Sequence, residues 1–300
     1  MKKKVVREND YLNSDKVFDK LVSYISKNGV QNAIFPIFKT KDFALYNNDC
    51  LEVMTRFPDN YIDMVFADPP YMLSNNGFTC QNGRMVSVNK GKWDKSKGFE
   101  QDLNFHEEWI SECKRILKPS GTIWISGTYH SIYQCGYLLQ KLGFHILNDI
   151  TWFKPNASPN LSCRFFTASH ETLIWARKDK NAKHYFDYKS MKEGHFPEDQ
   201  LKKEKSQMRS VWSLNTPSSA EKEFGKHPTQ KPLALLRRII KASTKDGDII
   251  FDPFNGGGTT GIASVQISNR KYIGCEIDLK FINLTIKKYQ SLNMTQKLFN

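Results

Sequence analysis

From Phe43 onward, short apolar runs alternate with longer stretches in which apolar and polar residues are mixed. Short apolar runs bounded by polar residues are typical of strands that are buried on both faces. Stretches with apolar residues three and four positions apart are typical of helices that pack on one side. Because the two patterns alternate, the chain predicts an α/β fold with a doubly wound, mostly parallel sheet.

The elements that this pattern predicts can be placed along the chain. The expected strands are 43–46, 64–67, 122–126, 145–152, 171–177, 249–251 and 272–275, and the expected helices are 14–27, 105–117, 131–142, 233–243 and 259–268. Strands 145–152 and 171–177 have no clear helix between them, which predicts an antiparallel pair at one edge of the sheet. In the first expected helix Ser14 can be the N-cap before an apolar stripe, and Asn28-Gly29 would end the helix.

Two long polar segments interrupt this alternation. Residues 73–98 carry Arg84, Lys90, Lys92, Lys95 and Lys97 among four glycines. Residues 178–226 hold 11 basic and 8 acidic side chains. Polar loops of this length within a compact domain are commonly functional or disordered, and charge alone fits a solvated surface as well as a binding face.

The size and the cysteines of the chain exclude some classes of protein. With 300 residues it can bury a full core without metals or disulfides. The six cysteines, Cys50, Cys80, Cys113, Cys135, Cys163 and Cys275, form no C-x-x-C pair, which argues against a zinc site and a disulfide framework. The apolar runs are too short to span a bilayer, and the charged start is unlike a signal peptide. We therefore expect a cytoplasmic protein without a metal or a membrane partner.

The net charge of +13 and the pI near 9.3 favour a polyanionic partner. Each Lys or Arg that pairs with a phosphate releases a counterion, so a basic surface binds nucleic acid favourably. Charge alone does not establish such a partner, because many basic proteins bind no nucleic acid.

The sharpest motif is Asp68-Pro69-Pro70-Tyr71, which directly follows the strand expected at 64–67. Ligands of open α/β sheets bind at the carboxyl ends of the strands. Two prolines remove two backbone donors and fix the path of the chain. The Asp68 carboxylate and the Pro69 carbonyl then form two fixed acceptors beside the Tyr71 ring. Such a set suits an amino group on a planar heterocycle.

A glycine-rich turn follows the strand expected at 249–251. It reads Asp252-Pro253-Phe254-Asn255-Gly256-Gly257-Gly258-Thr259-Thr260-Gly261 and opens the next helix. Glycines there let the backbone approach a ligand and leave helix N–H groups pointing at it. Glu276 ends the next strand, where a carboxylate can accept hydrogen bonds from ribose hydroxyls. Alone, this fingerprint would also fit a nicotinamide dehydrogenase.

Together the two motifs resemble the beta-class amino-methyltransferases that act on DNA. The likeness runs from about residue 43 to 289 and also includes Asn48-Asp49-Cys50, Leu117-Lys118-Pro119-Ser120-Gly121 and His227-Pro228-Thr229-Gln230-Lys231-Pro232. More narrowly, Trp93-Asp94 and the stretch 156–164 resemble the beta-class adenine enzymes of GATC restriction–modification systems. The resemblance implies the sheet of S-adenosylmethionine-dependent methyltransferases, circularly permuted, with an inserted target-recognition segment.

The resemblance also implies a division of the chain. Residues 1–40 would form an N-terminal helical extension and 41–177 the catalytic half. Residues 178–226 would form the target-recognition segment and 227–300 the cofactor-binding half. The expected substrate is double-stranded DNA, with single strands left open, and a homodimer is left open as the assembly.

By the same resemblance the site residues take roles. Asp68, Pro69, Pro70 and Tyr71 would be catalytic, with the flipped base held against Tyr71. S-adenosylmethionine would be held by Asp49, His227, Thr229, Gln230, Lys231, Asp252, Phe254, Asn255, Gly256, Gly257, Gly258, Thr259 and Glu276. Many relatives carry Ser where this chain has Gly257. His227 to Lys231 would begin the helix that closes over the methionine end.

The resemblance implies direct methyl transfer to N6 of adenine, without a metal or a covalent intermediate, and a flipped-out target base. An N4-cytosine or an RNA methyltransferase is the alternative. Lys90, Lys92, Lys95 and Lys97 are expected to hold the DNA on a loop that is mobile in the free protein.

Overall fold

The computed structural model describes residues 8–28, 33–73, 78–81, 84–87, 91, 94–194, 196, 199, 201, 203, 205–267 and 269–298. Within these residues the main sheet has the strand order β1-β2-β11-β10-β3-β6-β8-β7-β9. Its strands are β1 Phe38–Lys39, β2 Phe43–Tyr46, β3 Ile62–Ala67, β6 Leu117–Gly127, β7 His145–Phe153, β8 His170–Arg177, β9 Val211–Ser213, β10 Ile249–Asp252 and β11 Lys271–Cys275. The helices are α1 Glu8–Lys27, α2 Cys50–Met54, α3 Phe99–Ile116, α4 Ile132–Lys141, α5 Tyr188–Glu193, α6 Leu233–Ser243, α7 Thr259–Gln266 and α8 Leu279–Leu298.

The centre of the sheet is parallel, which confirms the predicted doubly wound fold. β2, β11, β10, β3 and β6 pair in parallel, side by side. β3 and β10 are neighbours, with Val65 opposite Phe251. The strand before Asp68 therefore lies beside the strand before Asp252, and both loops leave the same edge of the sheet.

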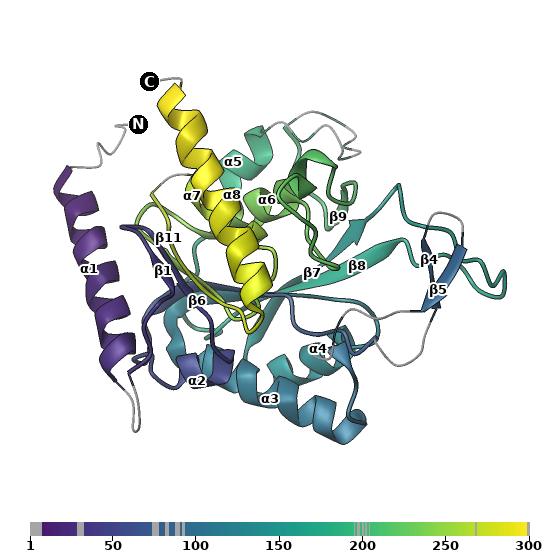
Figure 1. Ribbon diagram of the computed structural model, residues 1–300, viewed down its shortest axis with the longest axis horizontal. Coiled ribbons are helices and arrows are strands. Elements are labelled where there is room, and N and C mark those ends of the chain that lie inside the picture. The colour runs from purple at the N-terminus through teal and green to yellow at the C-terminus, as the bar shows by residue number, and fades with distance from the viewer. Residues whose placement is uncertain are drawn as a thin grey trace.

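Helices cover both faces of the sheet (Figure 1), which explains the continuous apolar runs in the strands. Along β3, Val65 and Ala67 point into one core with α1, α2, α3 and α4, whereas Met64 and Phe66 point into the other core. That second core is built with α6, α7 and α8. Each face of the sheet therefore has its own buried core.

The antiparallel pair of β7 and β8 is confirmed, but it is not the edge of the sheet. β9 pairs in parallel with β7 and lies outside it, with Trp212 opposite Trp152. β9 belongs to the segment 178–226, so part of the proposed target-recognition segment is an edge strand. Arg238 of α6 binds the Asp199 carboxylate at 2.9 and 2.5 Å and ties that segment to the second core.

The N-terminal helix, which was expected as a helical extension, packs on the main sheet. α1 begins at Glu8, well before the predicted cap at Ser14. Phe18, Leu21 and Ile25 are fully buried against the first core. β1 adds a short antiparallel strand to β2. Burial of this apolar stripe therefore fixes α1 to the sheet.

The polar segment 73–98 contains an antiparallel hairpin of β4 Phe78–Gln81 and β5 Arg84–Ser87. Lys90 and Lys92, which were expected to contact DNA, lie outside the described residues. Lys95 and Lys97 are exposed and line the cavity described below. The predicted DNA contacts of this segment remain a prediction.

Candidate active site

The residues that follow β3 are hydrogen-bonded to a carboxylate from the segment 73–98. Asp94 is fully buried and accepts hydrogen bonds from the backbone N–H of Tyr71 at 2.9 Å and of Leu73 at 3.2 Å. Pro69 and Pro70 have no backbone N–H to donate, so the N–H of Tyr71 is the first backbone donor after Asp68. The loop that carries Asp68 is therefore fixed at both ends.

Both oxygens of the Asp68 carboxylate are hydrogen-bonded. Oδ1 accepts from the Tyr71 hydroxyl at 2.6 Å, and Oδ2 accepts from Lys231 Nζ at 2.6 Å. Tyr71 is only 3% exposed and its ring does not line the cavity. Tyr71 thus lies beside Asp68 with its hydroxyl directed at the carboxylate, and the contact of its ring with the base remains a prediction. Lys231 was expected at the cofactor; it lines the cavity described below, and its ammonium group binds Asp68.

A second carboxylate, Glu171 at the start of β8, completes this cluster. Glu171 Oε2 lies 2.9 Å from the Tyr71 hydroxyl and 3.4 Å from Lys231 Nζ, and Oε1 accepts from Lys154 Nζ at 3.2 Å. Glu171 and Lys154 were not predicted from the sequence, because no local motif marks them. We call the five side chains Asp68, Tyr71, Lys154, Glu171 and Lys231 the carboxylate cluster.

The two carboxyl groups of the cluster differ in their proton affinity. Burial acts to raise the pKa of Glu171, but Lys231 and Lys154 outweigh it and hold that pKa at about 2. Burial also raises the pKa of Asp68, and there the opposing effect of Lys231 does not prevail. Glu171 therefore stays ionised, and Asp68 is the carboxyl group that can titrate in this cluster.

The glycine turn after β10 needs glycine for steric reasons. Gly256 and Gly258 have φ angles of 49° and 77°, in the left-handed region. A Cβ atom at Gly258 would lie 2.5 Å from the Thr285 side chain of α8. The backbone N–H of Gly256 donates to Glu276 Oε2 at 2.8 Å, and Lys288 Nζ donates to the Gly257 carbonyl at 2.9 Å. Glu276 and Lys288 therefore brace the turn from both sides.

Replacing Gly258 with Ala should destabilise the protein more than the same change at Gly247. Both residues have a left-handed backbone, which costs an Ala about 1 to 2 kcal/mol. A Cβ at Gly247 would come no closer than 3.4 Å to a neighbour, whereas at Gly258 it would clash with Thr285. We expect a loss of about 3 kcal/mol or more for Gly258→Ala, measured by urea unfolding. Equal losses for the two variants would contradict this account of the turn.

Asp252, at the end of β10, is a buried carboxyl group with a raised pKa. It is 2% exposed and accepts a hydrogen bond from the Phe254 N–H at 2.9 Å. Burial raises the pKa of Asp252 to about 7, against the opposing effect of the Thr260 hydroxyl. Near neutral pH, a cation that binds beside Asp252 would lower the pKa of this carboxyl group and favour its ionised form.

This shift of the Asp252 pKa predicts how stability depends on pH. Well below pH 4 the group is protonated in the folded and the unfolded chain. As the pH rises to about 7, the unfolded chain ionises first, so folding loses stability. In Asp252→Asn this loss is absent. Relative to this variant, the wild type should therefore lose roughly 2 to 3 kcal/mol between pH 5 and pH 8 in urea titrations. A difference that is the same at both pH values would refute the assignment.

The segment from His227 to Lys231 precedes α6 instead of beginning it. Pro232 is the N-cap and Leu233 the first helical residue, as the apolar pattern predicted, whereas the expectation from the resemblance that His227 to Lys231 begin the helix is wrong. The His227 ring packs on Phe281, with 4.2 Å between ring centroids, and a Cβ at Gly256 or Gly257 would lie within 3.2 Å of His227. The segment from His227 to Lys231 therefore packs against the glycine turn that follows β10.

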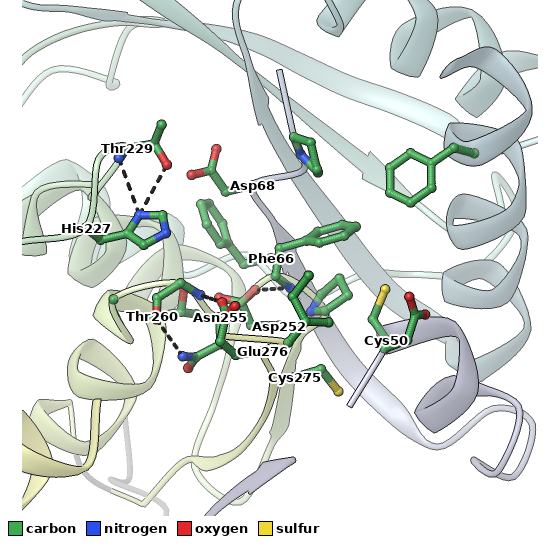
Figure 2. A pocket seen from close by; sticks show the side chains of 18 of the residues that line it. Cys50, Phe66, Asp68, His227, Thr229, Asp252, Asn255, Thr260, Cys275 and Glu276 are labelled. Atoms are coloured by element: carbon green, nitrogen blue, oxygen red, sulfur yellow. Dashed lines mark hydrogen bonds between the residues drawn. The ribbon is translucent and has the colours of Figure 1, made fainter. Parts of the chain in front are cut away.

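One cavity of about 600 Å³ joins the two motifs (Figure 2). Most of the predicted site residues line it: Asp49, Asp68, Pro70, His227, Thr229, Gln230, Lys231, Asp252, Phe254, Asn255, Gly256, Gly257, Thr259 and Glu276. Pro69, Tyr71 and Gly258 do not line it, although each adjoins a residue that does. Phe66, Phe105 and Ile277 add apolar walls that the sequence motifs did not indicate.

The cavity has the size and chemistry of a site for an organic cofactor. Its volume falls within the range usual for small-molecule sites, with apolar walls and a few convergent polar groups.

Across the part of the chain that the structure describes, no three His, Cys, Asp or Glu side chains gather as metal ligands would. Among the described helices, none combines the length and apolar character needed to cross a bilayer.

Comparison with known proteins agrees with this architecture. The profile of the family described as DNA methylase matches residues 62–288. The Type II methyltransferase M2.MboI of Moraxella bovis is 49% identical over 266 residues, which are 88% of this chain and 94% of that protein. M2.DpnII of Streptococcus pneumoniae, also a Type II methyltransferase, is 45% identical over 261 residues, 87% of this chain and 94% of that protein.

A solved structure shows the same fold with a cofactor bound. The crystal structure of the M1.HpyAVI–SAM complex is 28% identical, with a TM-score of 0.59, and the match covers 82% of this chain and 98% of that chain. The resemblance found in the sequence is thus confirmed by the family profile, by two close relatives and by a structure. With the DNA methylase profile matching most of its length, the chain belongs to the DNA methylase family.

Proposed function

We propose that this enzyme transfers a methyl group from S-adenosylmethionine to N6 of adenine in double-stranded DNA. We further propose that GATC is its recognition sequence and that it serves a restriction–modification system. The observation that carries the proposal is that the Asp68 carboxylate and the glycine turn face one cavity. The relatives named Type II methyltransferases support the restriction–modification setting.

The residues around the glycine turn fit S-adenosylmethionine. When bound, this cofactor supplies an electrophilic methyl group on a positively charged sulfur. Asp252 would face the cationic methionine end, and Glu276 would meet the ribose hydroxyls. The Glu276 carboxylate already binds the backbone N–H of Gly256 and of Asp278, at 2.8 and 2.9 Å, so it is fixed in place. Asp49, which caps α2 through the Leu51 N–H, would lie near the adenine.

Ligand-induced stabilisation would separate this cofactor from a nicotinamide. S-adenosylhomocysteine should raise the melting temperature in proportion to the logarithm of its concentration, and NAD should not. A shift with NAD alone would favour the dehydrogenase reading of the glycine turn.

Asp68 and the Pro69 carbonyl would accept the two hydrogens of the target amino group. The lone pair of that amino group is delocalised into the ring, so two aligned acceptors favour the pyramidal nitrogen that attacks the methyl group. In the structure Lys231 Nζ donates a hydrogen bond to the Asp68 oxygen Oδ2. Glu171, 3.4 Å from the same ammonium group, would keep that cation paired when the amino group binds Asp68.

The base and the sequence context can be tested together. The protein is incubated with methyl-labelled cofactor and two duplexes that differ only in carrying GATC or GTAC, and the DNA is digested to nucleosides. We expect N6-methyladenine from the GATC duplex and little label from the GTAC duplex. Label in N4-methylcytosine, or in adenine of both duplexes, would refute the base or the context respectively. RNA in place of the duplex tests the alternative substrate.

Single-stranded DNA as a second substrate and a homodimeric assembly also remain proposals. A DNA substrate agrees with the expected cytoplasmic location. Side-by-side rates on matched single and double strands, and the mass of the protein in solution, would decide the first two.

A further inference from the structure

An aromatic pair projects into solvent from the loop between β7 and β8. Phe165 is 70% exposed and Phe166 is 98% exposed, and Arg164 beside them is exposed as well. A soluble protein scatters single apolar side chains on its surface, but two adjacent aromatic rings at a loop tip indicate a contact with a partner. In Figure 1 this connection projects beyond the ends of β7 and β8.

The tip of this loop is organised by hydrogen bonds around Asn160. The Asn160 side-chain amide donates to the Phe165 carbonyl at 2.8 Å, and its backbone N–H donates to the Thr167 hydroxyl at 3.3 Å. The side-chain oxygen Oδ1 of Asn160 accepts from the Ser162 N–H at 3.0 Å. The turn is therefore closed on itself, and the aromatic pair is presented without being packed on the core.

The base of the loop reaches the carboxylate cluster. β7 runs parallel to β6 and β3, because both β6 and β7 pair antiparallel with β8. The loop therefore leaves the sheet at the edge where Asp68 lies. Lys154 follows β7 and its N–H donates to the Ser169 carbonyl, while its ammonium group binds Glu171 of the cluster. The base of the loop that carries the aromatic pair is thus tied to the carboxylate cluster.

We propose that Phe165 and Phe166 form a wedge that enters the DNA stack at the place vacated by the flipped base. The inference rests on the proposed function, since only a base inside a duplex must be flipped to reach Asp68. Unpairing and unstacking a base is unfavourable, and an apolar side chain in the gap offsets part of that cost. The Arg164 guanidinium, next to the pair, suits an adjacent phosphate.

The wedge predicts a defect that depends on how firmly the target base is paired. The test compares wild type, Phe165→Ala/Phe166→Ala and the control Phe35→Ala, whose ring is 67% exposed near β1 at the far edge of the sheet. Methyl transfer is measured on a GATC duplex, on the same duplex with an abasic site opposite the target adenine, and on the single strand. Because both rings are exposed, we expect the double variant to fold and to bind S-adenosylhomocysteine as the wild type does.

On the matched duplex the double variant should be about tenfold slower or worse, and the control unchanged. On the abasic duplex and on the single strand, the double variant should come within about twofold of the wild type. With 2-aminopurine at the target position, the fluorescence rise on binding should be smaller for the double variant than for the wild type.

Other outcomes would overturn the wedge. A double variant as fast as the wild type on the matched duplex would show that the rings do not help to open it. An equal loss on all three substrates would assign the rings to another role, such as contact between two copies, which a change in solution mass would reveal. If the wild type methylates none of the substrates, the proposed function fails and the wedge with it.

Discussion

Asp68→Ala should lower kcat for methyl transfer by about a hundredfold or more while the affinity for S-adenosylhomocysteine hardly changes. Loss of one aligned acceptor at a transition state typically costs about 2 kcal/mol or more. The fold should survive, because Lys231 keeps Glu171 as a partner at 3.4 Å. Single-turnover rates and calorimetric titration measure the two quantities.

The matched control is Asp59→Ala, which removes an exposed carboxylate paired with Arg115 and should leave both quantities unchanged. An Asp68→Ala enzyme that turns over near the wild-type rate would remove Asp68 from the chemistry. A variant that also loses the cofactor would place Asp68 in the binding of that cofactor.

Lys231→Met should destabilise the protein strongly and move its pH–rate profile. The change leaves the buried carboxylates of Asp68 and Glu171 with only Lys154, and breaking a buried ion pair on one side typically costs about 3 to 5 kcal/mol. Without the ammonium group the pKa of Asp68, which burial already raises, should rise further. Activity should therefore fall at neutral pH and recover in part at higher pH.

The control for this prediction is Lys118→Met, which removes a partly exposed partner of Asp63 at 2.7 Å. Such a pair contributes about 1 kcal/mol or less, so this variant should resemble the wild type. Urea unfolding measures the stability of the variants, and kcat across the pH range gives their pH–rate profiles. A Lys231→Met enzyme with an unchanged pH profile and a raised KM for the cofactor would return Lys231 to the cofactor role expected from the sequence.

The sequence predicted the sheet because its strands are buried on both faces. Runs such as Phe43–Tyr46 and Ile249–Asp252 leave no polar face, so their apolar character marks them directly. The Asp68 and glycine motifs were found for a similar reason, since each is a local turn with unusual backbone needs. Their meeting in one cavity followed from the parallel pairing of β3 and β10.

Long-range contacts could not be predicted in the same way. Glu171 lies 100 residues from Tyr71 in the chain, and neither its strand nor its neighbours mark it as part of the site. Asp94 was noted only within a resemblance, although it holds the exit from β3. β9 and α1 joined the main domain through pairing and burial that depend on distant residues. Such contacts have no periodic signal in the sequence.

A structure of the protein with S-adenosylhomocysteine and a GATC duplex would test the proposed reaction directly. We expect the cofactor product to lie against the glycine turn and Glu276, with the target adenine flipped into the same cavity. Its N6 should lie within hydrogen-bond distance of the Asp68 carboxylate and the Pro69 carbonyl, with Lys231 moved toward Glu171. A target base that remains stacked in the duplex, or that binds away from Asp68, would contradict the account.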